Sequence, residues 1–218
     1  MTWYASHTKL LTGSGDPPLG PGGVAASKKN AARRGAAIVF IDEAGFLMAP
    51  LARRSWAPRG QTPRLMQRGR SRRKASLIGA LVISPQRRRV RAYFEILPDA
   101  NFDAASILRF VQAVHRTLRT PIDLVWDRLQ AHYTEPMASW LLKHHRQVRA
   151  HLLPPYAPEL NPVELIWGYT KRNPLANFAP VEFADLVMQT QFAVLAVGDD
   201  QPLLRSLLRH CPLSLRLK

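Results

Sequence analysis

The sequence predicts an α/β domain, and three observations support this. Short apolar runs rich in β-branched residues alternate with segments whose apolar residues recur at helical spacing. A chain of 218 residues with 46% hydrophobic composition can bury the core of one ordinary domain. The predicted order is strand, strand, strand, helix, strand, helix, strand, helix, with an acidic residue after the first strand, after the fourth and on the last of these helices.

The chain divides into three predicted parts. Residues 1–27 are rich in Gly, Pro and Ser without a helical or strand period, so we interpret them as a linker or disordered leader. The segment KKNAARRGA then has the composition of the basic end of a helix. We expect the main domain at residues 28–180 and a C-terminal helix with a basic tail at residues 181–218. The Leu- and Arg-rich tail either packs on the domain or contacts DNA.

The first predicted strand, Ala37–Ile41, is apolar and ends in Asp42 and Glu43 before Gly45 turns the chain. A carboxylate at the carboxyl end of a central strand is a common place for chemistry in α/β proteins. The alternative for Asp42 is that it caps the turn. Glu43 is either a further acid of the site or an exposed, ion-paired residue.

The remaining strands are predicted at residues 75–84, 90–97, 122–126 and 148–153. The second and third pair antiparallel across a turn at residues 84–89. The fourth ends in Asp127, and His132 follows five residues later. His132 either orients a ligand or phosphate or makes a structural hydrogen bond. Helices are expected up to Leu118, with Asn101 and Asp103 as caps, at residues 135–144 and at residues 181–197.

The segment LPPYAPELNPVELIWGYTK, residues 153–171, predicts a chain reversal followed by a helix. Asn161 caps this helix, Pro162 suits its first position, and Glu164 then falls on its first turn. One buried face is expected, formed by Val163, Ile166, Trp167 and Thr170. Glu164 flanks that face and is either a site carboxylate or the acid of a capping box that bonds the Asn161 backbone.

The charge indicates a polyanionic partner. Thirty-one Lys and Arg against fifteen Asp and Glu leave a formal net charge of +16, which favours nucleic acid. No apolar run is long enough to cross a bilayer, and no signal peptide is visible, so we expect no membrane partner. A single cysteine, Cys211, excludes an internal disulfide and fits a reducing compartment, so we expect a cytoplasmic, nucleoid-associated protein.

Residues 51–91 carry thirteen Lys or Arg and no acid. Such a basic surface suits contacts to the DNA backbone, with an affinity that falls steeply with salt. The alternative is a charged surface that is merely solvated. The residues expected to contact DNA are Arg53, Arg54, Trp56, Arg59, Arg68, Arg70, Arg72, Arg73, Lys74, Arg128 and Lys171.

Asp42, Asp127 and Glu164 are the predicted catalytic and metal-binding residues. Three carboxylates at one end of a sheet repel each other unless a cation neutralises them, and oxygen ligands suit Mg²⁺ or Mn²⁺. Two such ions activate a water or a 3′-hydroxyl for an in-line phosphodiester displacement. The pattern therefore favours phosphoryl-transfer chemistry over a Ser or Cys nucleophile.

These pieces together resemble the catalytic domain of bacterial insertion-sequence transposases of the Tc/mariner-like DDE superfamily, of the insertion sequence 630 type. The matching segments are VFIDEAGF, WAPRGQTP, LVWDRLQAH and LPPYAPELNPVELIWGYTK. The resemblance implies a ribonuclease H-like fold, a mixed five-stranded sheet with helices on both faces. It also implies that Asp42, Asp127 and Glu164 bind two divalent ions for strand cleavage and transfer at a TA target, in a homodimer that holds the transposon ends.

The sequence departs from that family in two respects. Arg128 follows the second acid where similar sequences have Asn, and a cation there either weakens metal binding or contacts phosphate. Residues 1–27 cannot hold the helix-turn-helix domains of full-length members. We therefore expect either the second frame of a split transposase, with a separate upstream helix-turn-helix polypeptide, or a decayed copy. Two other functions stay open: a catalytically silent DNA-binding remnant or regulator, and a host nuclease on the same fold.

Overall fold

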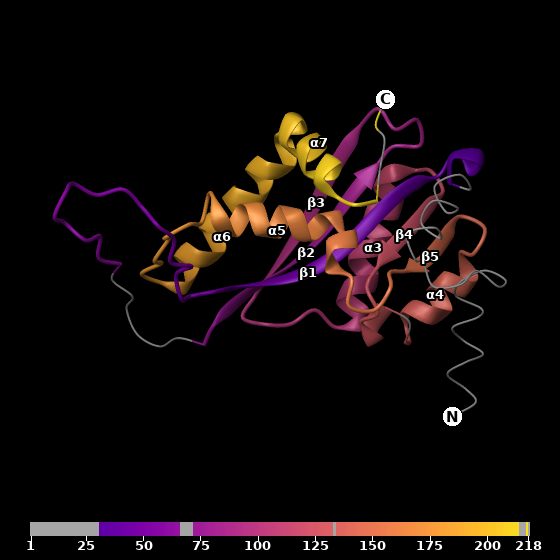
Figure 1. Ribbon diagram of the computed structural model, residues 1–218. Helices are drawn as coiled ribbons and strands as arrows, with labels where there is room; N and C mark the ends of the chain where they lie inside the picture. The colour runs from indigo at the N-terminus through magenta and orange to yellow at the C-terminus, as the bar shows by residue number, and fades with distance from the viewer. Residues whose placement is uncertain (1–30, 66–71, 133, 214–216, 218) are drawn as a thin grey trace.

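The computed structural model describes residues 31–65, 72–132, 134–213 and 217, and its centre is a five-stranded sheet of order β3-β2-β1-β4-β5 (Figure 1). β1, β2 and β3 form an antiparallel meander, whereas β4 and β5 run parallel to β1. The strands are β1 Ala37–Leu47, β2 Lys74–Ile83, β3 Val90–Pro98, β4 Ile122–Trp126 and β5 Val148–Leu152. Their existence and the antiparallel pairing of β2 with β3 confirm the prediction.

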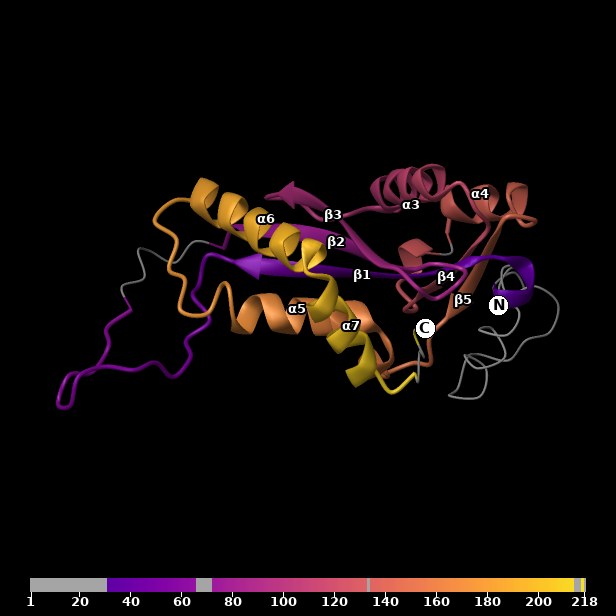
Figure 2. The same cartoon turned by 90° about the horizontal axis from the view of Figure 1, so that it is seen from above.

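Helices cover both faces of this sheet (Figure 2). On one face lie α3, Ala104–Leu118, and α4, Met137–Lys143, above a core that includes Ile41, Ile78 and Trp126. On the other face lie α5, Pro162–Arg172, α6, Phe183–Asp199, and α7, Gln201–His210. Two short 3-10 helices, Gln130–His132 and Pro158–Leu160, complete the connections. The predicted α/β class, a mixed five-stranded sheet with helices on both faces, is confirmed.

β1 is longer than the sequence predicts. The strand was expected to end before Asp42, but it continues to Leu47, and Gly45 pairs with Ser76 instead of turning the chain. The reason is the ten-residue partner β2, which hydrogen-bonds along β1 from Ile38 onward. Asp42 therefore lies inside a central strand, where the backbone fixes its position, and it does not cap a turn.

The helix starts show which caps the chain uses. Asp103, not Asn101, is the N-cap of α3, because its carboxylate accepts the Ser106 N–H in a reciprocal capping box. Asn161 is the N-cap of α5 and Pro162 is its first residue, as predicted. The predicted inner face of α5 is confirmed: Val163, Ile166, Trp167 and Thr170 are all buried.

The C-terminal residues pack on the same core as α5. The Leu- and Arg-rich tail forms α7, whose Leu204 and Leu208 are completely buried. The described residues 31–34 are helical, but the predicted leader at residues 1–27 lies outside the described part of the chain. Among the described residues, no helix combines the length and apolar character needed to cross a membrane.

Candidate active site

The three predicted acids line one cavity. Asp42 enters it from β1, Asp127 follows the last residue of β4, and Glu164 lies on the first turn of α5. The cavity has a volume of about 510 Å³, and its remaining wall is formed by Arg128, Leu129, Leu153, Pro154, Pro155, Tyr156, Ala157, Pro158 and Asn161. The segment that the sequence analysis identified as a chain reversal therefore closes the cavity over the sheet.

Asp42 is the most buried of the three acids, with 7% of its surface exposed. The Trp167 indole N–H donates a hydrogen bond to Asp42 Oδ2 at 2.8 Å. Burial raises the pKa of Asp42 to about 8, helped by the nearby charges of Glu164, Glu43 and Asp127, and the Trp167 hydrogen bond only partly opposes this. Without a cation, Asp42 therefore holds a proton at neutral pH.

Asn161 places Glu164 next to Asp42. Its side-chain amide donates to the Ile41 carbonyl oxygen at 3.0 Å, and its carbonyl oxygen accepts the Val163 N–H at 3.2 Å, so α5 begins against β1. The Asn161 backbone N–H donates to the Pro158 carbonyl oxygen, which leaves the exposed Glu164 carboxylate to line the cavity. Partial burial and the charge of Asp127 raise the pKa of Glu164, although Lys171 opposes the shift.

Asp127 is held in its ionised form. Its Oδ1 accepts the Leu129 N–H at 2.9 Å and lies 3.1 Å from His132 Nδ1. Burial raises the pKa of Asp127, but the hydrogen bonds from His132 and Leu129 outweigh it and hold the pKa below its ordinary value. The acid within β1 and the acid that follows its parallel neighbour β4 are thus biased in opposite directions, with Asp42 protonated and Asp127 charged.

His132 connects two acids and is almost fully buried, with 1% of its surface exposed. Its Nδ1 faces Asp127, its Nε2 lies 3.1 Å from Glu43 Oε1, and its ring stacks on Trp126 at 4.5 Å. Burial lowers the pKa of His132, but the bonds to Asp127 and Glu43 raise it to about 9. Of the two roles left open for His132, the contacts show a residue that positions Asp127, while Glu43 is its ion-paired partner.

Two contributors were missed as site residues. Trp167 was assigned only to the buried face of α5, and Gly79 was not singled out within its strand. A Cβ atom on Gly79 would lie 2.7 Å from Cη2 of Trp167, so a glycine opposite Asp42 makes room for the indole that bonds it. An isolated glycine in a strand often marks such a close approach, and this was the available signal.

The predicted DNA-contacting residues fall in several places. Arg53, Arg54, Trp56 and Arg59 lie on the arm, residues 51–65, which is exposed throughout and projects from the sheet (Figure 1). Trp56 is fully exposed. The start of β2 and the two positions before it hold Lys74, Arg72 and Arg73. Arg128 donates a hydrogen bond from Nε to the Leu153 carbonyl oxygen. Lys171 lies over the Phe46 ring. Arg68 and Arg70 lie outside the described residues.

The basic clusters of residues 51–91 do not form one continuous face. Because β2 runs antiparallel to β1, the cluster at residues 87–91 lies near the start of β1, whereas the arm follows its end. Arg73 is also engaged, since its guanidinium pairs with Asp99 at 2.9 Å and lies over the Phe183 ring at 3.9 Å. The expectation of a single basic face is therefore wrong.

The carboxylate oxygens of the three acids in the cavity are suitable ligands for a hard divalent cation. All three acids offer oxygen ligands, and their mutual repulsion, which adds to burial in raising the pKa of Asp42, is what a cation relieves. In the described part of the chain, however, no three His, Cys, Asp or Glu side chains lie close enough together to hold one ion. The carboxylates share a cavity, and they would have to move closer together to ligate a common ion.

Comparison with known proteins agrees with this fold. A family model described as DDE superfamily endonuclease matches residues 37–185. No curated protein matches the chain. The fold is similar to a Mos1 transposase paired-end complex with its left transposon end, at 16% identity and a TM-score of 0.59, over 88% of this chain and 57% of that one.

Two further solved structures are similar. One is the Mos1 mariner paired-end complex with Mn, at 16% identity and a TM-score of 0.60, over 97% of this chain and 68% of that one. The other is the catalytic domain of Mos1 mariner transposase, at 15% identity and a TM-score of 0.51, over 88% and 87%. These likenesses show the ribonuclease H-like fold. The chain spans 57% of the length of the first structure named.

Proposed function

This chain belongs to the DDE superfamily endonuclease family, and from that premise we propose that it is the catalytic domain of a DNA transposase of the Tc/mariner-like, insertion sequence 630 type. It cleaves DNA strands and transfers them to a new site in a reaction that depends on divalent metal ions. The observation that carries the proposal is the cavity in which Asp42, Asp127 and Glu164 meet from β1, β4 and α5.

Asp42, Asp127 and Glu164 would hold two Mg²⁺ or Mn²⁺ ions. Such ions, when bound, activate the attacking water or 3′-hydroxyl and stabilise the leaving oxygen of a phosphodiester. Structures of Mos1 paired-end complexes are described with Mn and with Mg, which supports the same choice of metal in this chain.

The chain's own residues orient the acids. Trp167 fixes one oxygen of Asp42, and His132 holds Asp127 at the end of β4. Arg128 ties the end of β4 to Leu153 and lines the cavity, where its charge can face a phosphodiester. These contacts would keep two of the acids in place while DNA enters and leaves.

Double-stranded DNA is the proposed partner, as transposon ends and as a target that contains TA. The arm and its exposed Arg53, Arg54, Trp56 and Arg59 offer a basic surface beside the end of β1. Recognition of the ends would come from a helix-turn-helix domain. The net charge of +16 supports DNA as the partner.

A homodimer is the proposed assembly on DNA, and α6 offers a surface for it. Residues 186–198 contain no charged side chain, although the chain is strongly basic. Met188, Phe192 and Leu195 recur on one side of α6 and are 47%, 62% and 48% exposed. An uncharged apolar stripe allows two basic copies to approach with the least repulsion. Sedimentation velocity of the wild type and of Phe192→Glu tests this surface.

A catalytically silent DNA-binding remnant is the second candidate. One observation favours it: the described side chains do not bring three ligands within reach of one ion. Arg128 beside Asp127 would then oppose metal binding. Both candidates bind DNA in a salt-sensitive way, so binding alone does not separate them.

Nicking of supercoiled plasmid by the purified chain separates the two functions. The reaction is run with Mn²⁺, with Mg²⁺ and with a chelator, for the wild type, for Asp127→Asn and for Asp199→Asn. Asp199 is an exposed acid outside the cavity and serves as the matched control. We expect metal-dependent nicking by the wild type and by Asp199→Asn, and none by Asp127→Asn. Binding of DNA by all three without any nicking would favour the remnant.

A further inference from the structure

A second cavity lies at the turn between β2 and β3, on the face of the sheet that carries α3. Its volume is about 340 Å³. Its apolar wall includes Ala37, Val82 and Leu118. The polar lining is Ser84, Gln86, Thr120, Arg88, Arg89 and Arg91. The cavity therefore combines three arginines with an apolar wall.

The turn that carries these arginines is fixed by its own hydrogen bonds. Ser84 Oγ accepts the backbone N–H groups of Arg88 and Arg89 at 3.2 Å and 3.0 Å, and the Ser84 N–H donates to the Arg89 carbonyl oxygen. From α7, Arg205 donates to the Arg88 carbonyl oxygen and ties the turn to the rest of the domain. The arginines thus extend from a pre-organised backbone.

Within the described part of the chain, no acidic side chain lines this cavity or pairs with its arginines. No acidic residue is among the lining residues. Across the described ranges, none of the ion pairs includes Arg88, Arg89 or Arg91. All three are exposed, and Arg116 and Arg119 at the end of α3 add further charge nearby. Clustered like charges are unfavourable for the fold, and a bound anion relieves them.

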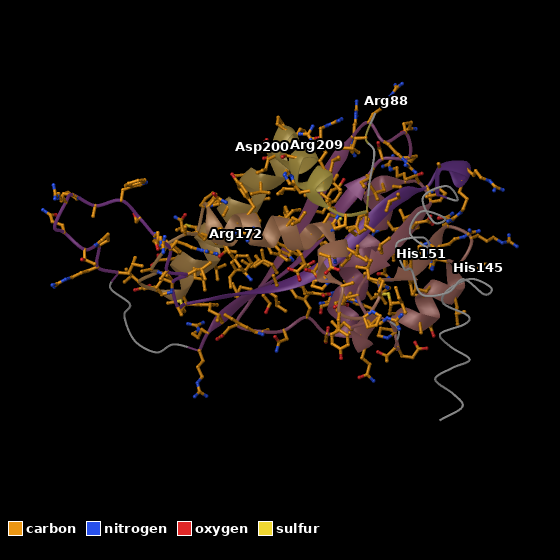
Figure 3. The ribbon with its side chains drawn as sticks, in the orientation of Figure 1. Arg88, His145, His151, Arg172, Asp200 and Arg209 are labelled. Carbon is orange, nitrogen blue, oxygen red and sulfur yellow. The ribbon has the colours of Figure 1, made fainter. Side chains whose placement is uncertain are left out.

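The second cavity and the acidic cavity lie on opposite faces of the sheet. The side chains of Ala37 and Val82 belong to the core under α3, whereas Asp42 contacts Trp167 of α5 on the other face. Arg88 lies at the end of the molecule away from the arm (Figure 3). Duplex DNA is stiff over about 150 base pairs, so one straight duplex does not wrap from one face to the other.

We propose that the Arg88–Arg89–Arg91 cavity binds the phosphodiester backbone of a second DNA duplex while a first duplex occupies the acidic cavity. The proposal deepens the proposed function, because strand transfer requires that donor and target DNA are held together. The fork of each guanidinium donates paired hydrogen bonds to phosphate oxygens, and the apolar wall accommodates the sugar. One chain therefore bridges two duplexes.

A bridging assay tests the proposal without any cleavage. An immobilised duplex is loaded with the full chain in EDTA, and capture of a second, labelled duplex is measured. The variant Arg88→Ala/Arg89→Ala/Arg91→Ala should still bind the immobilised duplex but lose capture of the second. Arg109→Ala/Lys143→Ala/Arg146→Ala removes the same charge from exposed positions on the α3 and α4 side, outside the second cavity, and should retain capture. Equal capture by both triple variants would overturn the proposal.

The salt dependence gives a quantitative readout. Each phosphate contact contributes roughly 0.9 to the slope of log affinity against log salt, so three contacts contribute roughly 2.7. Between 50 and 200 mM salt, capture by the wild type should therefore fall roughly 40-fold through these contacts alone. Arg88→Lys/Arg89→Lys/Arg91→Lys should keep most of this slope. A slope that does not change in the alanine variant would contradict phosphate binding at this cavity.

Two controls separate this inference from neighbouring explanations. Inorganic phosphate at ionic strength matched with chloride should compete no better than the salt itself; specific competition would assign the cavity to a small phosphate ligand and overturn the duplex proposal. Asp199→Asn, which changes an exposed acid outside both cavities, should bridge as well as the wild type. If plasmid nicking fails but bridging depends on the three arginines, the proposed catalysis is wrong and the second DNA site stands.

Discussion

Asp42→Asn should stabilise the metal-free protein, and the gain should grow with pH. Asp42 is buried inside β1 and near three other acids, so its ionisation in the folded state is unfavourable. Asparagine keeps the size of the side chain and an oxygen that accepts the Trp167 indole N–H. It removes only the proton equilibrium. A loss of stability would be the usual result of changing a buried side chain, so this prediction has a distinctive sign.

The magnitude follows from the pKa of Asp42, which is about 8 in the folded protein and 3.8 in its reference state. Because the folded pKa is raised, stability is complete below pH 3.8 and is lost as the pH rises toward 8. Each pH unit in this window costs about 1.4 kcal/mol. The wild type thus loses up to about 4 kcal/mol at pH 7. For a chain of this size, Asp42→Asn should raise Tm by about 5–15 °C at pH 7.

The assay is urea unfolding and thermal melting between pH 4.5 and 8.5 in EDTA. The free energy of unfolding of Asp42→Asn minus that of the wild type should be about 1 kcal/mol at pH 4.5 and increase steadily to pH 8. Glu95→Gln changes an exposed acid on β3 and should differ from the wild type by less than about 0.5 kcal/mol. If Asp42→Asn lowers the free energy of unfolding, or changes it equally at every pH, the protein does not contain an Asp42 with a raised pKa and the reasoning is refuted.

Three further predictions concern the residues around the acids. His132→Gln should destabilise the protein by about 3 kcal/mol below pH 6.5, because the bonds of His132 to Asp127 and Glu43 raise its pKa to about 9. This loss of stability should shrink as the pH rises through 9, and urea unfolding from pH 6 to 10 measures it. Trp167→Phe should cost about 2 kcal/mol, more at pH 8.5 than at pH 6, since the lost indole N–H serves ionised Asp42 best; equal losses at both values would contradict this. Gly79→Ala should cost about 1–3 kcal/mol in thermal melts, because its Cβ displaces the Trp167 ring.

Local rules explain what the sequence could predict. The cap at Asn161, the first-turn proline and the spacing of Val163, Ile166 and Trp167 depend on neighbours within two helical turns, and each was placed correctly. The positions of the five strands follow from short apolar runs in the same way. Asp42 and Asp127 meet because β1 and β4 pair in parallel, and Asn161 brings Glu164 of α5 beside them.

Non-local pairing explains what the sequence could not show. The extension of β1 beyond Asp42 depends on β2, whose paired residues lie 27 (74 − 47) to 35 (78 − 43) residues further along the chain. His132 meets Glu43 across 89 residues, and Trp167 meets Asp42 across 125. The division of the basic clusters is also a result of strand direction, because antiparallel pairing takes residues 87–91 away from the arm. No periodicity or composition carries this information.

The acids of the cavity differ because two different elements control them. From the α5 face, Trp167 bonds Asp42 but leaves it buried among other acids, so its pKa stays high. From the α3 face, His132 lowers the pKa of Asp127. The metal-free site therefore carries one fewer negative charge at neutral pH than three carboxylates would give, which limits the cost of folding around it. A cation that binds all three must displace the proton of Asp42, so its affinity should increase as the pH rises toward 8.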